Sequence, residues 1–141
     1  MKTFIFALLL IVPALSFASG AQPFFDIPIM SSCDMSTSSC NSNGTTLDQV
    51  HTLSVQAVFT GSPVGTFKLQ VSNDTVAICN GTNPSCNVTN WSDVTGSSQA
   101  VSAAGNITYE YALVGFRWIR LVYTKTSGTG TANAKLSAKG F

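Results

Sequence analysis

The sequence predicts an all-β fold: a single-domain antiparallel β-sandwich of the jelly-roll kind, stapled by two local disulfides. After Ala18, apolar and polar residues alternate with a period of two in several short segments, and no apolar repeat of about 3.6 residues is sustained. Clusters of Gly, Pro, Asn and Ser separate these segments and mark turns. About seven or eight short strands at such regular spacing are typical of sandwiches and jelly rolls.

The first segment, Met1–Ala18, has the pattern of a cleaved secretory signal peptide. Lys2 supplies the positive charge and Phe4–Val12 forms the apolar region. Ser16–Ala18 is a cleavage site with small residues at its first and third positions. The apolar region is too short to span a bilayer comfortably. We therefore expect a secreted chain, in the periplasm or at the cell surface, with no membrane span after cleavage. The alternative is a retained N-terminal anchor.

The remaining chain is close to neutral and poor in charge. The sequence has a formal net charge of +1, and 9% of its residues are charged. This excludes the basic patch of a nucleic-acid-binding protein and a polybasic membrane-binding patch. Polarity is carried by Ser, Thr, Asn and Gly instead, which suits packing against copies of the same chain or contact with glycans. The predicted partners are therefore a homo-oligomer or other subunits of a surface assembly, or a glycan.

The four cysteines form two pairs of equal spacing, Cys33–Cys40 and Cys79–Cys86. In an oxidising compartment an even number of cysteines indicates disulfides. The equal gaps favour two local pairings, each worth about 2–3 kcal/mol through restriction of the unfolded chain. A zinc site of four thiolates is the alternative, but metal-binding pairs normally have shorter gaps.

The segment Gln22–Met30 carries two prolines, Pro23 and Pro28, which exclude a central strand. We expect an N-terminal edge segment or arm whose aromatic residues, Phe24 and Phe25, pack on the body of the domain. The alternative is an arm that docks on a neighbouring subunit, since exchange of such an element is a low-cost route to oligomers.

The next segments predict a loop followed by a hairpin. Ser31–Thr46 is rich in Ser, Thr and Asn and is held by the first cysteine pair. Strands are expected in Leu47–Phe59 and Thr66–Ser72, joined as a hairpin by the turn residues Thr60–Gly65. Thr75–Val88 is an excursion that carries the second cysteine pair. The side chains expected in the core are Leu53, Val55, Ala57, Phe59, Phe67, Leu69 and Val71.

The second half predicts four more strands. Asn90–Val94 is a short returning strand, and Ile107–Leu113 alternates again. Gly115–Lys125 has apolar residues on both faces, which indicates a central strand covered on both sides. Thr131–Lys139 is expected to pair with it across the turn Ser127–Gly130.

Catalytic residues are scarce, so no enzyme, no metal site and no cofactor are predicted. His51, the single histidine, starts a strand and has no second base or metal ligand of its kind. Glu110 is the single glutamate, so no carboxylate pair for glycoside hydrolysis is evident. We expect Glu110 to form a cross-strand ion pair with Arg117 or Arg120.

Several Asn-x-Ser/Thr triplets fit the acceptor pattern for N-glycosylation. A chain this rich in Asn, Ser and Thr produces such matches by composition alone. If the host glycosylates them, they mark exposed loops. The asparagines are Asn43, Asn73, Asn80, Asn87, Asn90 and Asn106.

Three segments resemble the discoidin, or galactose-binding-like, jelly rolls. Phe67–Asp74 ends in Ser-Asn-Asp, Asn90–Val94 contains the returning tryptophan, and Phe116–Thr124 contains the late Arg-Trp-Ile-Arg-Leu strand. The resemblance covers about residues 52–139 and implies a jelly-roll fold and binding of surface glycans. It makes Trp91, with Asn73 and Asp74, the candidate ligand-binding residues. The excursion around Cys79–Cys86 and the lack of an acidic calcium-binding loop depart from the family pattern.

A second resemblance concerns Thr60–Asp74 and Gly115–Gly140, which are similar to small modules of phage virion or tail-associated proteins and bacterial surface proteins. It implies a structural or adhesive role. The sequence thus predicts an exported, non-enzymatic subunit of a surface assembly that acts by self-association, with Phe24 and Phe25 in the assembly arm. A carbohydrate-binding module is the alternative. The predicted parts are a signal peptide (1–18), an arm and stapled loop (19–46) and a β-sandwich domain (47–141).

Overall fold

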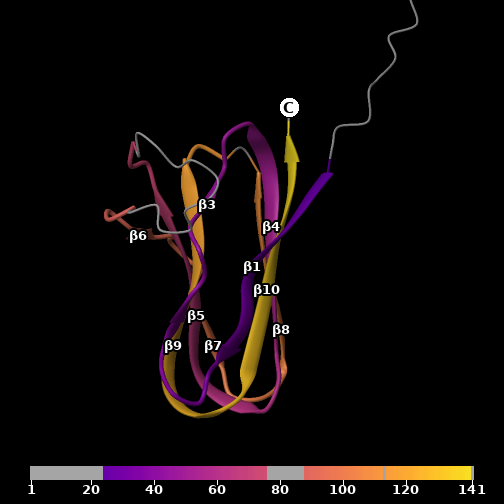
Figure 1. Ribbon diagram of the computed structural model, residues 1–141, viewed down its shortest axis with the longest axis vertical. Helices are drawn as coiled ribbons and strands as arrows, with labels where there is room; N and C mark the ends of the chain where they lie inside the picture. Colours follow the sequence, from indigo (N-terminus) through magenta and orange to yellow (C-terminus); the bar gives the residue numbers. More distant parts are fainter. Residues whose placement is uncertain (1–23, 76–87, 113, 141) are drawn as a thin grey trace, which may run out of the picture.

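The computed structural model describes residues 24–75, 88–112 and 114–140, which form two antiparallel β-sheets stacked face to face (Figure 1). The predicted all-β sandwich is therefore confirmed. No helix that could cross a membrane occurs in this part of the chain.

Sheet A has four strands. It runs in the order β1 (Phe24–Asp34), β10 (Thr131–Gly140), β4 (Val50–Phe59) and β8 (Gly105–Ala112). The outer strands of this sheet, β1 and β8, are its two edges. The edge position predicted for the proline-containing N-terminal segment is thereby confirmed. A proline has no backbone N–H to donate, so it is tolerated in an edge strand but not in a central one.

Sheet B is built on two long strands. It runs in the order β2 (Cys40–Asn41), β9 (Trp118–Thr129), β5 (Ser62–Ser72) and β6 (Ser92–Asp93), while β3 (Thr45–Thr46) pairs with β9 and β7 (Gln99–Val101) pairs with β5. The segment predicted as a stapled loop thus also contains the end of β1 and the short strands β2 and β3, and supplies strands to both sheets.

The core lies between the sheets and is filled by the alternate residues that the sequence predicts. All seven side chains expected from β4 and β5 are buried. Phe67 sits between two other rings, with centroid distances of 5.4 Å to Phe59 and 4.9 Å to Tyr123. The further buried residues of β9 and β10 are Ile119, Leu121, Tyr123, Ala132, Ala134, Leu136 and Ala138.

Both predicted hairpins are wrong. The strands β4 and β5 follow each other in sequence but lie in different sheets, and so do β9 and β10. In each case the tight turn carries the chain across the core instead of back along the same sheet. The period-two alternation is the same for two strands paired in one sheet and for two strands that face each other, so the pattern alone favours neither.

The two crossings lie against each other at one end of the sandwich and depend on glycine. The Thr60 N–H donates to the Thr131 carbonyl at 3.0 Å. A Cβ on Gly128, where φ is +79°, would lie 2.1 Å from the Ser62 carbonyl oxygen. That backbone conformation is poorly available to other residues, and the carbonyl leaves no room for a side chain.

We expect Gly128→Ala to destabilise the domain by more than the cost of an unfavourable φ alone, which is about 1–3 kcal/mol. Gly96→Ala is the matched control, because Gly96 has a φ of +78° with nothing within 4 Å of the added Cβ. Urea unfolding of both variants separates strain from steric clash. Equal losses of stability in the two variants would contradict the packing described for the crossing.

The strand β9 occupies the central position predicted for it, between β2 and β3 on one side and β5 on the other. It starts at Trp118 rather than Gly115, since the Arg117 N–H still belongs to the preceding loop and donates to the Asn73 side-chain oxygen at 3.0 Å. Trp118 and Val122 are buried on its outer face, so both of its faces are covered in part.

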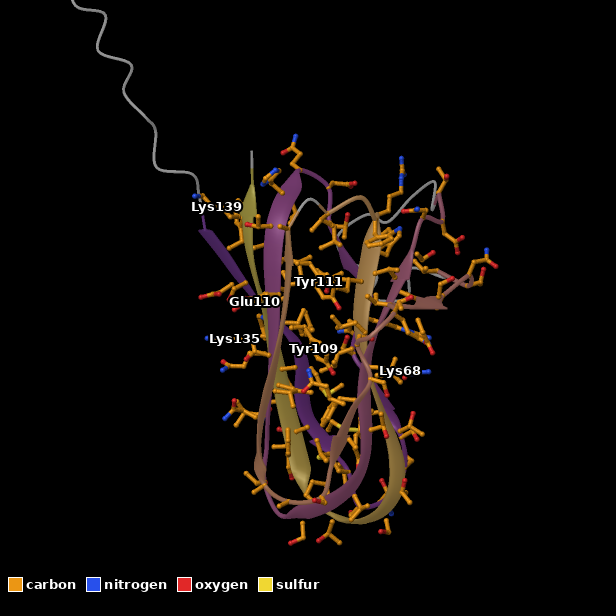
Figure 2. All side chains as sticks on the ribbon, turned by 180° about the vertical axis from the view of Figure 1, so that it is seen from behind. Lys68, Tyr109, Glu110, Tyr111, Lys135 and Lys139 are labelled. Carbon is orange, nitrogen blue, oxygen red and sulfur yellow. A yellow bond between two sulfur atoms is a disulfide. The ribbon has the colours of Figure 1, made fainter. Side chains whose placement is uncertain are left out.

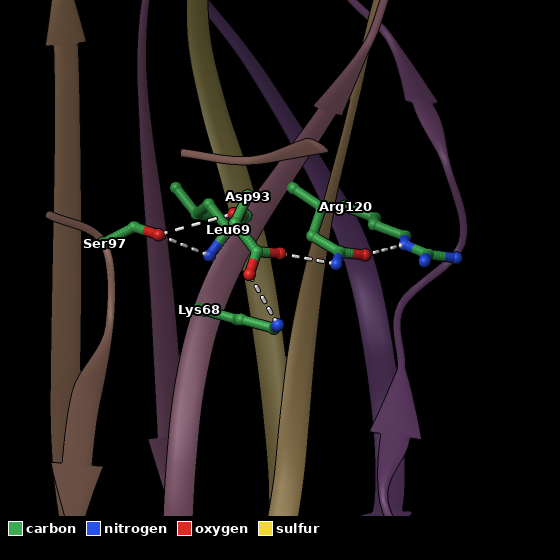
Figure 3. A network of polar contacts seen from close by, with 6 residues as sticks. Lys68, Leu69, Asp93, Ser97 and Arg120 are labelled. Atoms are coloured by element: carbon green, nitrogen blue, oxygen red, sulfur yellow. Dashed lines mark hydrogen bonds and ion pairs between the residues drawn. The ribbon is translucent and has the colours of Figure 1, made fainter. Parts of the chain in front are cut away.

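On its other side, β5 is bordered by two short strands, with a gap between them that a side chain fills. On this side the strand pairs with β7 through Phe67 and with β6 from Gln70 onward, so Leu69 lies between the two short strands. Its carbonyl accepts from the Val94 N–H at 2.9 Å. The buried Ser97 hydroxyl accepts from the Leu69 N–H at 3.1 Å and donates to the Leu69 carbonyl at 3.3 Å (Figure 3). A serine thus substitutes for a rung of the ladder.

The predicted disulfide Cys33–Cys40 is present and joins the end of β1 to β2. It therefore links the two sheets at one side of the sandwich. The second predicted pair, Cys79–Cys86, lies outside the described residues, as does the predicted signal peptide.

Candidate functional site

The first half of β1 forms a free sheet edge. The strand pairs with β10 along its length, from Phe24 opposite Lys139 to Asp34 opposite Thr131. On its second side, the Ile29 carbonyl accepts from the Asn43 N–H at 3.2 Å, but no described strand pairs with the residues before it. On the side away from β10, residues 24–28 therefore have no strand partner among the described residues, and such an edge can pair with another strand.

An apolar groove lies beside this free edge. Figure 1 shows the end of the sandwich that it occupies, where β1 begins and β10 ends. Phe25 and Ile27 face the inner side of sheet A, yet they are 49% and 39% exposed. They are exposed because no long strand of sheet B lies opposite them. The facing segment consists of the two-residue strand β3 and the residues that lead from β3 to β4. The groove has a volume of about 520 Å³ and is lined by Phe25, Ile27, Thr46, Asp48, Gln49, Val50, Leu136, Ala138 and Gly140; we call it the β1 groove.

The structure corrects the expectation that both phenylalanines pack on the body of the domain. The ring of Phe25 is half-exposed, because it covers only one wall of the β1 groove. The backbone of Phe24 pairs with Lys139, and its side chain lies outside the described part. A role for these two residues in assembly stays a prediction.

The candidate ligand residues Asn73 and Asp74 follow β5 and hold neighbouring loops. The Asp74 carboxylate accepts from the Thr89 and Asn90 backbone N–H groups, both at 2.9 Å, and from the Asn90 amide at 2.9 Å. These hydrogen bonds, from Asn90 above all, stabilise the charged form and lower the pKa of Asp74. The Asn73 side chain accepts from Arg117. Asp74 therefore anchors the chain in front of Trp91, and Asn73 anchors the loop in front of β9.

Trp91 lies on the outer side of sheet B and is partly buried. Its indole N–H donates to the Val88 carbonyl at 2.8 Å. The Arg120 guanidinium carbon lies 4.3 Å from the centre of a ring of the indole, a cation–π contact. One face of the ring predicted as a sugar platform is thus covered by an arginine.

A chain of polar contacts continues from Arg120 across sheet B (Figure 3). The Arg120 Nε–H donates to Gln70 at 2.8 Å, and the Gln70 amide donates to Asp93 at 2.6 Å. The second Asp93 oxygen pairs with Lys68 Nζ at 2.7 Å. We call Lys68, Gln70, Trp91, Asp93 and Arg120 the Arg120 cluster.

The charges of the cluster act on one another. The hydrogen bond from Lys68, and then the one from Gln70, lower the pKa of the Asp93 carboxyl. Burial lowers the pKa of Arg120, and the nearby charge of Asp93 offsets part of this effect. Sequence reasoning missed this cluster, because it placed β9 beside β10 and not beside β5, where Gln70 and Arg120 are opposite each other.

The predicted ion pair of Glu110 with Arg117 or Arg120 is wrong. Glu110 lies on β8 in sheet A, opposite Ser54, while Arg120 lies in sheet B. Figure 2 shows Glu110 on the outer side of the sandwich, with Tyr109 and Tyr111 between the sheets. Alternation along β8 puts the glutamate on the face turned away from the other sheet.

No catalytic constellation emerges in the described part of the chain. His51 lies at the start of β4, as predicted. Across residues 24–75, 88–112 and 114–140, no group of three or more His, Cys, Asp or Glu side chains is close enough to hold a metal ion.

Comparison with known proteins gives the fold and little else. No family model and no curated protein matches the chain. Among solved structures, the SPBc2 prophage-derived protein YomS is 11% identical, covers 83% of this chain and 95% of its own, and has a TM-score of 0.52. The two chains share a fold. A second solved structure, from "Bacillus endospore appendages form a novel family of disulfide-linked pili", is 10% identical. The match covers 88% of this chain and 94% of the other, with a TM-score of 0.47.

The likeness to YomS agrees with the predicted resemblance to all-β modules of phage proteins. It does not support the discoidin family in particular. At 11% identity it establishes fold similarity and no shared activity.

Proposed function

We propose that this protein is an exported, non-enzymatic subunit of a surface assembly and acts by self-association. The observation that carries the proposal is the β1 groove, where an unpaired strand edge and two half-exposed apolar side chains occur together. Soluble chains usually cover or charge such edges. Here the free residues 24–28 carry one charge, that of Asp26, and one proline, Pro28, which leaves the backbone N–H groups of the residues before it available to a second strand.

A second copy of the chain is the occupant that best fits this surface. A strand of the copy added at the free edge of β1 would pair with the backbone of residues 24–28 and cover Phe25 and Ile27. The chain has a formal net charge of only +1, so two copies repel each other weakly. Strand addition of this kind draws its affinity from main-chain hydrogen bonds and its specificity from side chains in pockets.

The expected result is that the secreted chain, starting at Ser19, forms a defined oligomer, and that Phe25→Ser with Ile27→Ser shifts it to monomer. Light scattering at several concentrations measures the change. Removing two half-exposed apolar side chains takes away the groove's contribution to association, about 25 cal/mol for each Å² that the partner would bury. Circular dichroism checks that the variant keeps its strands.

Val58→Ser is the matched control. Val58 is 50% exposed, but it lies on β4, on the outer face of sheet A and away from the β1 groove. This variant should keep the oligomeric state of the parent. A parent chain that is strictly monomeric at high concentration, or equal effects of the control and the double variant, would contradict the proposal.

Point variants are preferable to removal of the predicted arm, Gln22–Met30. That deletion would remove most of β1 from its pairing with β10, including the buried side chains of Ile29 and Met30. It would therefore disrupt the sandwich whether or not the segment contacts a second copy.

A further inference from the structure

Arg120 is a half-buried cation whose charge is not matched by a carboxylate of its own. Its Nε–H donates to Gln70 and its guanidinium carbon lies over a ring of Trp91. No ion pair or hydrogen bond to its two terminal nitrogens is found within residues 24–75, 88–112 and 114–140. The nearby Asp93 uses one oxygen for Lys68 and the other for Gln70. Figure 3 shows the end of the Arg120 side chain pointing away from Asp93 and Lys68.

The guanidinium is also held in place before any ligand arrives. Its carbon lies 4.3 Å from the centre of a Trp91 ring and its Nε–H is hydrogen-bonded to Gln70, so two contacts restrict the side chain. Trp91 is itself positioned, because the Asp74 carboxylate ties the backbone of the preceding Thr89 and Asn90. An immobilised guanidinium fork binds a planar carboxylate through two parallel hydrogen bonds with little further loss of side-chain entropy.

We propose that the Arg120 cluster binds the carboxylate of an acidic sugar, with Arg120 as the bidentate anchor and Trp91 as the surface beside which the sugar ring lies. This site is on the outer face of sheet B, separate from the β1 groove, and the inference does not depend on the proposed function. The cluster carries two cations, Lys68 and Arg120, and one anion, Asp93, which leaves one positive charge to pair with a carboxylate of the ligand.

The test uses the full secreted chain and ¹⁵N-edited NMR, in which the Arg120 Nε–H and Trp91 Nε1–H signals report on the site directly. The probes are trigalacturonate and its methyl ester, which has the same sugar but no charged carboxylate. We expect trigalacturonate to shift both signals saturably with a Kd in the millimolar range or below, about 4 kcal/mol of binding free energy or more. The ester should leave both signals in place.

Arg120→Lys should lower the affinity for trigalacturonate about tenfold or more, since lysine keeps the charge but loses the fork. Arg117→Lys makes the same exchange at the exposed neighbouring arginine, whose side chain is outside the cluster, and should bind like the parent. The amide spectrum of each variant shows that it is folded, so a lost site is not confused with a lost fold.

Four results would overturn the inference. They are no shift at about ten times a millimolar Kd, equal binding of the methyl ester, unchanged affinity in Arg120→Lys, and tighter binding of triglutamate or inorganic sulfate than of trigalacturonate. The last result would assign the site to acidic peptides or to anions in general.

Discussion

Phe67→Ala is expected to cost the domain about 3–5 kcal/mol of unfolding free energy, the range found when a buried phenylalanine is truncated. Phe67 is fully buried and lies between the rings of Phe59, from sheet A, and Tyr123, from sheet B. Its removal leaves a cavity at the place where the two sheets are joined by aromatic contacts. Since small domains are stable by only about 5–15 kcal/mol, this one change should bring the protein close to unfolding.

Urea or thermal unfolding of the parent and the variant measures the loss. Phe116→Ala removes the same atoms from a side chain that is 43% exposed, so it is the matched control and should cost well under half as much. Similar losses for both variants would mean that the sheets are not packed through Phe67.

The buried faces of the strands could be predicted from the sequence because alternation depends only on local geometry. Side chains of a strand point to opposite sides in turn, so Leu53, Val55 and Phe67, Leu69 had to share the inner side of their strands. This argument needs no knowledge of which strand lies next to which. It therefore holds even though both predicted hairpins are wrong.

The pairing of strands could not be predicted in the same way. A short turn after β4 is compatible with a hairpin or with a crossing to the other sheet, and the difference lies in tertiary contacts such as the one between Gly128 and the Ser62 carbonyl. The sequence pattern predicts β10 as the neighbour of β9. It therefore does not predict the contact of Arg120, on β9, with Gln70, on β5. A wrong neighbour in the predicted sheet therefore leaves the Arg120 cluster unpredicted.

The β1 groove could also be predicted only in part from the sequence. The two prolines correctly predict an edge strand, since they exclude a central one. The exposure of Phe25 and Ile27 on the inner face depends on the opposite sheet, where β3 has only two residues before the chain crosses to β4. Side chains that the pattern places inside can therefore remain open to solvent or to a partner.

Tyr109→Phe is expected to stabilise the domain by about 1–2 kcal/mol, although it removes a polar group from a native protein. The Tyr109 ring is buried between the sheets, and its hydroxyl has no hydrogen-bond partner in the described part of the chain. Burial, with a smaller contribution from the adjacent Tyr111, raises the pKa of Tyr109, so the hydroxyl is neutral at physiological pH. A buried neutral donor without an acceptor carries a desolvation cost of about 1–3 kcal/mol, which phenylalanine does not incur.

Tyr123→Phe makes the same chemical change at a second buried tyrosine and should have the opposite sign. The Tyr123 hydroxyl donates to the Val64 carbonyl at 3.1 Å, where a register shift interrupts the pairing of β5 with β9. Its loss leaves that carbonyl without its partner and should destabilise the domain by about 1 kcal/mol. Unfolding curves of the two variants test the pair together. Destabilisation by Tyr109→Phe would mean that the hydroxyl has a partner, such as a buried water, and that the space beside Tyr109 is polar and hydrated rather than dry.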